Sequence, residues 1–245
     1  MFTRLLVGLD DSPRADAALE QAVVLGKRFR STIVAVHVRG DGGGAEGTRL
    51  LDGARERVLA GELEAEIVDT VGAPDVALAD LAQGADAVLV GRSGSTTRGP
   101  ALGPTTAALI RISSPCVIVC AGTASPMRQC AVAFDGGDTS LRALSLAARF
   151  ASIADATLHV IHAATDRAVA LRVVGVAEAT LSLRRVAFVT HVETGQPGEV
   201  IGNVIRQTRC DGLFVGAHAR SARTSAPSHA EEILRHTAIP VVVQP

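Results

Sequence analysis

Short apolar runs alternate along the chain with longer segments in which apolar residues recur every three or four positions. The short runs are rich in Val, Ile and Leu and are bounded by Gly, Asp or Ser, which is typical of buried strands. The longer segments are typical of amphipathic helices. Strands that alternate with helices predict a parallel sheet covered by helices on both faces, so the expected fold class is α/β.

The pattern predicts the same series of elements in each half of the chain. In the first half, we expect strands at residues 5–9, 32–38, 64–71, 87–90 and 116–120. Helices are expected from Ser12-Pro13, at 50–59, from Gly72-Ala73-Pro74 and at 105–112, and the glycine-rich segment 39–47 is expected to be a flexible connection. In the second half, a strand near Cys130 is followed by expected strands at 157–163, 186–192, 213–215 and 241–243, and by expected helices at 139–151, within 166–184, at 199–208 and at 230–236.

Several landmarks recur in the second half at a constant offset of 125 residues. A shared offset at this many positions indicates an internal duplication. We therefore expect two domains, 1–124 and 125–245, joined by the small-residue segment 121–126. The matching pairs are Asp10 and Asp135, His37 and His162, Asp86 and Asp211, Gly91 and Gly216, and Pro115 and Pro240.

Composition and charge exclude some classes of binding partner for this protein. The 245 residues carry a formal net charge of −1, without any block of five or more Lys or Arg residues. This argues against nucleic acid or an anionic membrane as a partner held by bulk charge. No apolar run reaches the ~18 residues of a membrane span, and Asp10 comes too early for the apolar region of a signal peptide, so we expect a cytoplasmic protein.

The residue types that bind metals or undergo redox chemistry show no recognisable spacing. His159 and His162 are three apart on an expected strand and would face opposite sides, and His218 and His229 lack an evident third ligand. The cysteines contain no CxxC pair and are expected to pack as small hydrophobes, so we expect no metal site. They are Cys116, Cys120, Cys130 and Cys210.

The segment 86–112 carries the clearest candidate chemistry. An apolar strand runs into a loop that contains Gly91, Gly94 and Gly103 and several hydroxyl residues, and a helical pattern begins at Thr105. Such a loop lets backbone N–H groups and a helix dipole contact an anion. The chain has neither a P-loop nor a GxGxxG fingerprint after a strand, and no nucleophile or paired carboxylates stand out beside the loop, so an enzyme is the weakest interpretation.

Several short motifs together resemble a universal stress protein domain, and the resemblance covers nearly the whole chain as a tandem pair. It implies two Rossmann-like domains of the adenine-nucleotide alpha-hydrolase-like type, each with a five-stranded parallel sheet. We expect a pseudo-twofold dimer of the two, because pairing their apolar final strands would remove two exposed edges. The motifs are Val7-Gly8-Leu9-Asp10-Asp11-Ser12, Val36-His37-Val38, Gly72-Ala73-Pro74 and the glycines of 91–103, then Ala133-Phe134-Asp135-Gly136, Gly195-Gln196-Pro197 and residues 231–243.

The resemblance also implies a binding site. ATP-binding members of the family are similar to G-x2-G-x9-G followed by Ser or Thr, which places Gly91 and Gly94 at the ribose and phosphates and Gly103 at the phosphates. Asp10 would face the ribose, and the backbone of Val38 would face the adenine. No catalytic residue and no metal beyond nucleotide-bound Mg²⁺ is expected. The expected binding residues for ATP or another adenine nucleotide are Gly8, Leu9, Asp10, Val38, Val90, Gly91, Ser93, Gly94, Gly103, Pro104 and Thr105.

The chain departs from that pattern in both halves. Eight residues separate Gly94 from Gly103, and Pro104 stands at the Ser/Thr position, where it removes one hydroxyl and one backbone donor. Thr105 could supply a hydroxyl one place later. In the second half, Ala219 replaces the second glycine, so we expect any nucleotide to bind in the first domain.

Two functions therefore remain open. The first is a stress-response regulatory protein that binds an adenine nucleotide in its first domain, uses its second domain for structure and has at most a weak ATPase activity. The alternative is a member that binds no nucleotide and acts as a protein-interaction or dimerisation module, for example as a homodimer. Gly91 and Gly94 favour the first function, and Pro104 favours the second.

Overall fold

The computed structural model describes residues 1–40, 45–94, 101–113, 115–164, 166–217, 233–234 and 237–245. The chain divides into two compact units, Met1–Ser125 and Pro126–Pro245. Each unit contains five parallel strands that alternate with helices, so the expected α/β fold class is confirmed.

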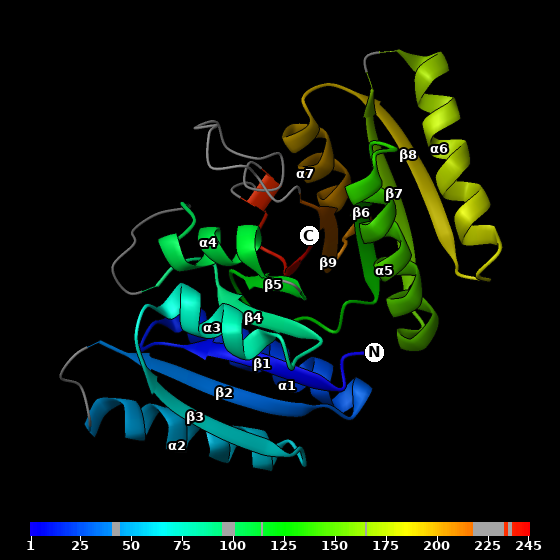
Figure 1. Ribbon diagram of the computed structural model, residues 1–245. Helices are drawn as coiled ribbons and strands as arrows, with labels where there is room; N and C mark the ends of the chain where they lie inside the picture. Colours follow the sequence, from blue (N-terminus) through cyan, green and yellow to red (C-terminus); the bar gives the residue numbers. More distant parts are fainter. Residues whose placement is uncertain (41–44, 95–100, 114, 165, 218–232, 235–236) are drawn as a thin grey trace. The chain divides into compact units, whose positions relative to one another are not determined.

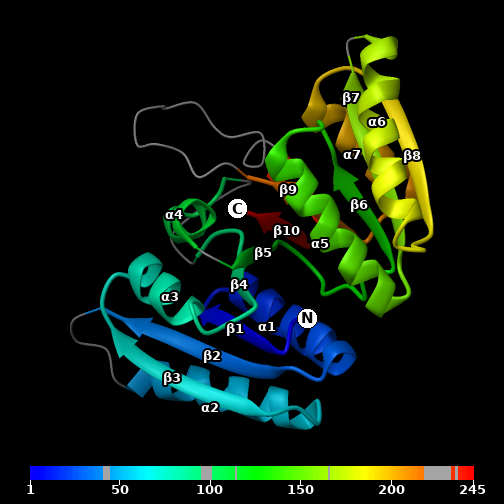
Figure 2. The same cartoon turned by 45° about the vertical axis from the view of Figure 1, so that its right-hand side comes forward.

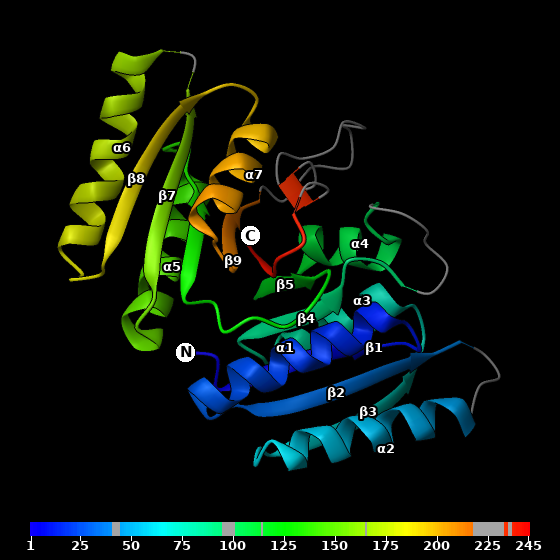
Figure 3. The same ribbon diagram turned by 180° about the vertical axis from the view of Figure 1, so that it is seen from behind.

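The first unit, coloured blue to green in Figure 1, follows the element order that the sequence predicts. Its elements are β1 (Arg4–Leu9), α1 (Pro13–Phe29), β2 (Thr32–Arg39), α2 (Ala45–Ala60), β3 (Ala65–Val71), α3 (Pro74–Ala82), β4 (Ala87–Gly91), α4 (Pro104–Ile112) and β5 (Cys116–Cys120). The strands lie in the order β3-β2-β1-β4-β5. Helices α1 and α2 cover one face of the sheet, and α3 and α4 cover the other (Figures 1 and 3).

The second unit repeats this plan. Its described elements are β6 (Gln129–Ala133), α5 (Asp138–Ala154), β7 (Thr157–Ala164), α6 (Arg167–Ser182), β8 (Phe188–Thr194), α7 (Pro197–Thr208), β9 (Gly212–Gly216) and β10 (Val241–Gln244). The strand order is β8-β7-β6-β9-β10, which matches the order of the first unit. Helices α5 and α6 lie on one face, with α6 along β7 and β8, and α7 lies on the other face (Figure 2).

Some boundaries differ from the ranges expected from the sequence. Helix α2 begins at Ala45, inside the segment expected to be a flexible connection, and a Cβ on Gly47 in its first turn would come within 2.6 Å of Cδ2 of His37. Strand β8 begins two residues late because Arg185 adopts a left-handed conformation, with φ 54°, and turns the chain before the strand. Of the helix expected at 230–236, residues 233–234 are helical and the others lie outside the described residues.

Local signals fix where the first helix begins and ends. Ser12 is its N-cap, and the Ser12 hydroxyl accepts a hydrogen bond from the Ala15 N–H (3.2 Å), while Pro13 occupies the first helical position. Arg30 ends the helix in the left-handed conformation and donates its N–H to the Gly26 carbonyl. Both ends therefore satisfy backbone groups that a helix leaves without partners.

An aspartate before each fourth strand holds the start of the first strand of the same unit. The Asp86 carboxylate accepts hydrogen bonds from the Thr3 N–H (2.6 Å), the Thr3 hydroxyl (2.7 Å) and the Arg4 N–H (3.1 Å). Burial opposes ionisation of Asp86, but these hydrogen bonds outweigh burial and lower its pKa. Asp211 accepts in the same way from the Gln129 N–H (2.8 Å). The repeat of Asp86 as Asp211 therefore has a structural explanation, because each aspartate holds the start of the neighbouring central strand in register.

Candidate functional site

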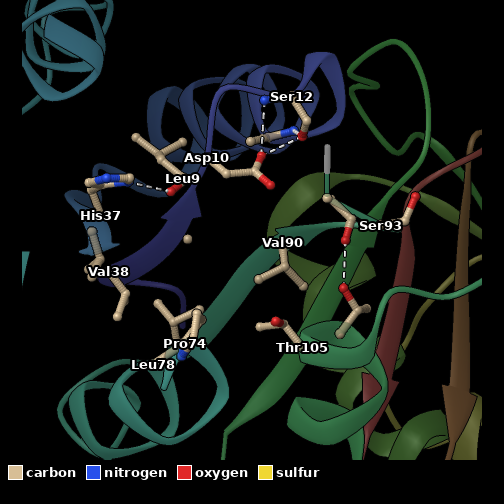
Figure 4. A pocket seen from close by; sticks show the side chains of 16 residues that line it. Leu9, Asp10, Ser12, His37, Val38, Pro74, Leu78, Val90, Ser93 and Thr105 are labelled. Carbon is tan, nitrogen blue, oxygen red and sulfur yellow. Dashed lines mark hydrogen bonds between the residues drawn. The ribbon is translucent and has the colours of Figure 1, made fainter. Parts of the chain in front are cut away.

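A pocket opens at the carboxyl ends of β1, β2 and β4 in the first unit (Figure 4). Strands β1 and β4 are neighbours, although the chain leaves β1 toward β2 on the other side. This is the switch point of the sheet, where open α/β sheets bind ligands. The pocket is lined by Gly8, Leu9, Asp10, Ser12, Ala15, Val36, His37, Val38, Pro74, Leu78, Val90, Gly91, Ser93, Gly94, Thr105 and Thr106.

The turn between β1 and α1 fixes the orientation of Asp10. Its Oδ1 accepts hydrogen bonds from the Ser12 N–H (3.1 Å) and from the Ser12 hydroxyl (Figure 4). The same hydroxyl caps α1 through Ala15, so Ser12 connects the carboxylate to the helix N-terminus. The carboxylate is therefore positioned in the pocket by the fold itself.

Gly91, at the end of β4, lies against the first turn of α1. A Cβ on Gly91 would come within 2.8 Å of Cβ and 2.9 Å of the carbonyl carbon of Arg14. Gly216 has the same relation to Thr139 in the second unit, where the distance to the carbonyl carbon would be 2.4 Å. The repeated glycine thus lets a helix approach the strand end in each unit, and this packing explains it without a ligand.

The two later glycines of the loop allow a close approach of the chain to itself. A Cβ on Gly94 would lie 2.6 Å from Oδ2 of Asp10, and a Cβ on Gly103 would lie 2.9 Å from Cα of Ser93. The Gly103 N–H also donates to the Arg92 carbonyl (2.9 Å). Gly103 therefore closes the base of the loop, while Gly94 lies beside the Asp10 carboxylate.

Hydroxyl groups from the loop and from α4 lie at one end of the pocket, which we call its polar end. The Thr106 hydroxyl donates to the Gly91 carbonyl (2.8 Å). Ser93 is only 2% exposed, and its hydroxyl has no hydrogen-bond partner among the described residues. A buried hydroxyl that makes no hydrogen bond costs about 1–3 kcal/mol. A bound polar group would remove this cost, so Ser93 is the lining residue that points most directly to a ligand.

The opposite wall of the pocket is apolar. Val36 and Val38 come from β2, Leu78 from α3 and Val90 from β4, and all four side chains border the same space. A Cβ on Gly8 would come within 2.9 Å of Cδ1 of Leu78, so the absent side chain lets α3 cover β1 closely. An apolar wall facing a polar end is the usual arrangement for a small-molecule site.

His37, which lines the pocket, connects the carboxyl ends of β1 and β2. Its Nδ1 lies 3.1 Å from the Leu9 carbonyl oxygen, and this carbonyl accepts only, so Nδ1 carries the proton. The repeat partner His162 makes the same contact with the Phe134 carbonyl at 2.8 Å. The histidine of each second strand is therefore explained by a structural hydrogen bond that both units share.

Nine of the eleven expected binding residues line this pocket, and Gly103 and Pro104 do not. Pro104 instead occupies the first position of α4, with Gly103 as the N-cap. The sequence analysis missed Ser12, Ala15, Val36, His37, Pro74, Leu78 and Thr106 as lining residues, although it had noted Val36-His37 as a repeated motif and Pro74 as a helix start. In the second unit, Ala219 and the rest of the corresponding loop lie outside the described residues.

A second polar cluster lies on the sheet of the second unit. His159 Nδ1 is 3.0 Å from His191 Nε2, its Nε2 is 2.9 Å from Gln129 Oε1, and the two rings are stacked at 5.3 Å. Burial lowers the pKa of both histidines, and the charge of His191 lowers that of His159 further. His162 makes its contact elsewhere, with Phe134, so it does not join His159 in a shared site.

Two further features of the chain bear on its chemistry. Burial raises the pKa of Cys116 and of Cys120 to about 12, and all four cysteines are free and buried. In the part of the chain that the structure describes, no group of three or more His, Cys, Asp or Glu side chains is arranged to hold a metal ion. Over the same residues, no helix combines the length and the apolar character needed to cross a bilayer.

Comparison with known proteins decides the family. The model of the universal stress protein family matches residues 1–120 and 163–245, which is most of the chain. The chain belongs to the universal stress protein family. No protein of curated function matches it.

Solved structures show that the universal stress protein fold extends over both units. The chain is similar to a universal stress protein from Archaeoglobus fulgidus at 20% identity and a TM-score of 0.80, with 100% of this chain and 98% of that chain covered. A functionally unknown protein from Pseudomonas aeruginosa matches at 17% identity and a TM-score of 0.77, with 99% and 92% covered. A putative universal stress protein from Pseudomonas aeruginosa matches at 19% identity and 0.75, with 99% and 93% covered. At these identities the similarity shows the fold alone.

Proposed function

We propose that this universal stress protein binds an adenine nucleotide in the pocket of its first unit and acts as a nucleotide-responsive regulatory protein. The observation that carries the proposal is the buried hydroxyl of Ser93 at the polar end of a pocket whose other wall is apolar. A ligand with a flat apolar part and a polar tail matches both ends. The expectation from the family resemblance and the position at the sheet's switch point support the same assignment.

Different lining residues would contact the base, the ribose and the phosphate of such a ligand. Val36, Val38 and Leu78 would contact the base, and the Asp10 carboxylate would accept hydrogen bonds from ribose hydroxyls. Ser93 and Thr105, with the N-terminus of α4, would donate to a phosphate. Each of these groups is set in place by strand ends or a helix start.

The described residues favour binding over catalysis. The Ser12 hydroxyl is bonded to Asp10, and the proton on Nδ1 of His37 is bonded to the Leu9 carbonyl. The Ser12 hydroxyl also accepts from the Ala15 N–H at the start of α1, so both side chains are held by contacts that the fold itself needs. Regulation through the bound state does not require turnover.

The absence of Trp and Tyr makes the first test simple. The chain has six Phe and no Trp or Tyr, so the protein itself absorbs little near 260–280 nm. Purified protein should carry an adenine spectrum that is released on denaturation, and calorimetric titration should give one ligand per chain. A spectrum without adenine, together with no binding of added adenosine, AMP or ATP, would refute the proposal.

Two matched substitutions locate the site. Gly94→Val places a branched side chain where a Cβ alone would already be 2.6 Å from Oδ2 of Asp10, and it should abolish binding. The obstacle is the end of the Asp10 side chain, and no other described residue lies within 4 Å of the added Cβ, so we expect the variant to fold. Ala219→Val, at the repeat position in the second unit, should change binding little. Loss of binding in the Ala219 variant alone, or a stoichiometry of two, would contradict the assignment to the first unit.

The alternative function, a protein-interaction module without nucleotide, is favoured by one surface feature. A groove between α3 and β3 is lined by Val68, Val71, Val76 and Leu81, and Val71 and Val76 are each 53% exposed. Exposed apolar grooves often mark protein contacts. The same titrations decide between the two functions, because this alternative expects no binding of any adenine ligand.

A further inference from the structure

The outer side of helix α6 is apolar, although it is exposed. The helix packs on β7, β8 and α5, and Figures 1 and 3 show no other described element of the second unit over its outer side. Val169, Val176 and Leu183 lie on that side and are 45%, 47% and 88% exposed. Single exposed apolar residues are ordinary, but three on one face of a helix form a patch that can bind a partner.

These three residues, which we call the outer row of α6, recur at an interval of seven. Seven residues make nearly two turns, so the three side chains lie in line along the helix. Leu183 is the C-cap and keeps a helical conformation, so the row reaches the end of the helix. The inner side of α6 is formed by a separate set of buried residues, Ala170, Val174, Ala177 and Leu181.

The duplication provides a comparison, because α2 follows the second strand of the first unit as α6 does in the second unit. Of the eight exposed residues described in α2, five are charged. Of the nine exposed residues described in α6, two are charged, Arg172 and Glu178, and Glu178 accepts a hydrogen bond from the Thr190 hydroxyl of β8 (3.1 Å). The fold therefore accepts a charged helix at this place, and the apolar outer row is particular to the second unit.

The spacing makes the outer row complementary to a second copy of itself. Val176 lies seven residues from each of the other two members, so reversing the helix exchanges Val169 with Leu183 and leaves Val176 in place. A twofold axis at Val176 would therefore bring Val176 against its own copy and Val169 against Leu183 of the second copy. An apolar interval of seven also suits two helices that pack at a small angle.

The neighbours of the outer row allow two helices to approach closely. Gly175 and Ala179 project little from the helix, and a Cβ on Gly175 would meet no described atom within 4 Å. The same axis would place Arg172 opposite Thr180 of the second copy, whose hydroxyl donates to the Val176 carbonyl and leaves its oxygen free to accept. The two copies of Arg172 would be about 12 Å apart along the pair, beyond the screening length at physiological salt.

The size of the surface sets the strength of the contact. Helix α6 has 16 residues. Such a helix is about 24 Å long and about 10 Å wide, so an antiparallel pair would bury roughly 400 Å² of each copy. Standard stable interfaces bury about 800 Å² of each partner. The area therefore predicts a weak pair that forms as the protein concentration rises.

We propose that two copies of the chain associate through the outer row of α6 as an antiparallel, twofold-related pair. The proposal is independent of nucleotide binding, since no residue of the outer row lines the pocket of the first unit. A membrane surface fits the same helix less well, because interfacial helices carry many Lys and Arg residues beside their apolar face, and the described exposed residues of α6 include Arg172 alone.

Sedimentation velocity of the full chain over a wide range of concentrations tests the association, and we expect a reversible equilibrium between monomer and dimer. Val176→Glu would bring two carboxylates together at the axis and should raise the dissociation constant at least tenfold, while glutamate suits an exposed helical position. Leu59→Glu, at a 52% exposed position of α2, is the matched control and should change the constant less than twofold. A monomer at every concentration, or a Val176→Glu variant that dimerises like the parent chain, would overturn the proposal.

Cysteine cross-linking with a short bifunctional maleimide tests the antiparallel geometry. The four native cysteines are buried, so one introduced cysteine supplies the accessible thiol. Val176→Cys should link to its own copy. Leu183→Cys should link to Val169→Cys in a mixture much faster than to itself, because two copies of residue 183 would lie about 21 Å apart along the pair. Failure of Val176→Cys to link, or equally fast linking of Leu183→Cys to itself, would refute this arrangement.

Discussion

Replacing Gly91 by alanine should destabilise the first unit, although alanine normally stabilises a chain relative to glycine. The added Cβ would lie 2.8 Å from Cβ, 2.9 Å from the carbonyl carbon and 3.0 Å from the carbonyl oxygen of Arg14. Two of these three atoms belong to the backbone of α1, so the helix must move away from β4 to restore ordinary contacts. Overpacking of this kind costs about 1–3 kcal/mol.

The opposing effect is smaller. Exchanging glycine for alanine reduces the entropy of the unfolded chain and contributes about 0.4–1 kcal/mol of stability where the native backbone accepts alanine. The net expectation for Gly91→Ala is therefore a loss of about 1–2 kcal/mol of unfolding free energy. Gly216→Ala should destabilise the second unit at least as much, because its Cβ would lie 2.4 Å from the carbonyl carbon of Thr139.

Gly53→Ala is the matched control, since Gly53 lies inside α2 and no atom of the described part of the chain lies within 4 Å of the added Cβ. This variant should gain about 0.5–1 kcal/mol from helix propensity. Urea unfolding followed by circular dichroism in the far ultraviolet measures all three changes as shifts of the transition midpoint. A Gly91→Ala variant as stable as the parent protein would refute the packing explanation for this glycine.

Two further predictions concern titratable groups. Because burial lowers the pKa of His159 and His191 below that of the unfolded chain, the unfolded state binds more protons in mild acid, so the second unit should lose stability as the pH falls below about 6.5. His159→Val introduces the residue that stands at the repeat position, Val34. This variant should flatten the dependence of the melting temperature on pH between 8 and 5, and an unchanged slope would show that the histidine pair is not the cause of the pH dependence. Burial raises the pKa of Cys116 and of Cys120 to about 12, so both thiols should resist alkylation at pH 8 in the native protein and react fully after unfolding. Mass spectrometry counts the alkyl groups added, and rapid labelling of these two cysteines in the native protein would contradict the prediction.

The element order could be predicted from the sequence because the signals are local. The period of the apolar residues marked each strand and helix, and Ser12-Pro13 marked a helix start that the structure confirms. Close packing between distant residues carries no local signal: in the first turn of α2, a Cβ on Gly47 would come within 2.6 Å of Cδ2 of His37. The left-handed turn at Arg185, which delays β8, has no sequence signal because nonglycine residues in this conformation are uncommon.

The candidate site could be predicted in part for the same reason. Loop positions such as Asp10 and Ser93 follow strands, and the carboxyl ends of parallel strands gather at one edge of a sheet. Leu78 and Thr106 enter the pocket from helices, where the amphipathic pattern indicates burial without showing against which element. The Ser93 hydroxyl finds no hydrogen-bond partner among the described residues, which is a property of the packed structure that no sequence pattern reveals.

The duplication separates residues that the fold needs from residues that distinguish the first unit. Gly91 and Gly216 both let a helix approach a strand end, Asp86 and Asp211 both bind the start of a central strand, and His37 and His162 both bond a strand carbonyl. These three repeated pairs are thus accounted for by folding, and matching them to a binding signature would assign a ligand role to packing residues.

The residues at the polar end of the pocket, unlike these repeated pairs, change between the two copies. Ser93 and Gly94 stand where the second half has His218 and Ala219, and Ser12 stands where it has Gly137. The carboxylate itself is retained as Asp135, whose Oδ1 accepts from the Gly137 N–H (2.8 Å) and the Ser140 hydroxyl (2.6 Å). A carboxylate present in both units cannot by itself select a ligand, so selectivity must come from the neighbouring Ser93 and Gly94, which is why substitutions there should change binding without changing the fold.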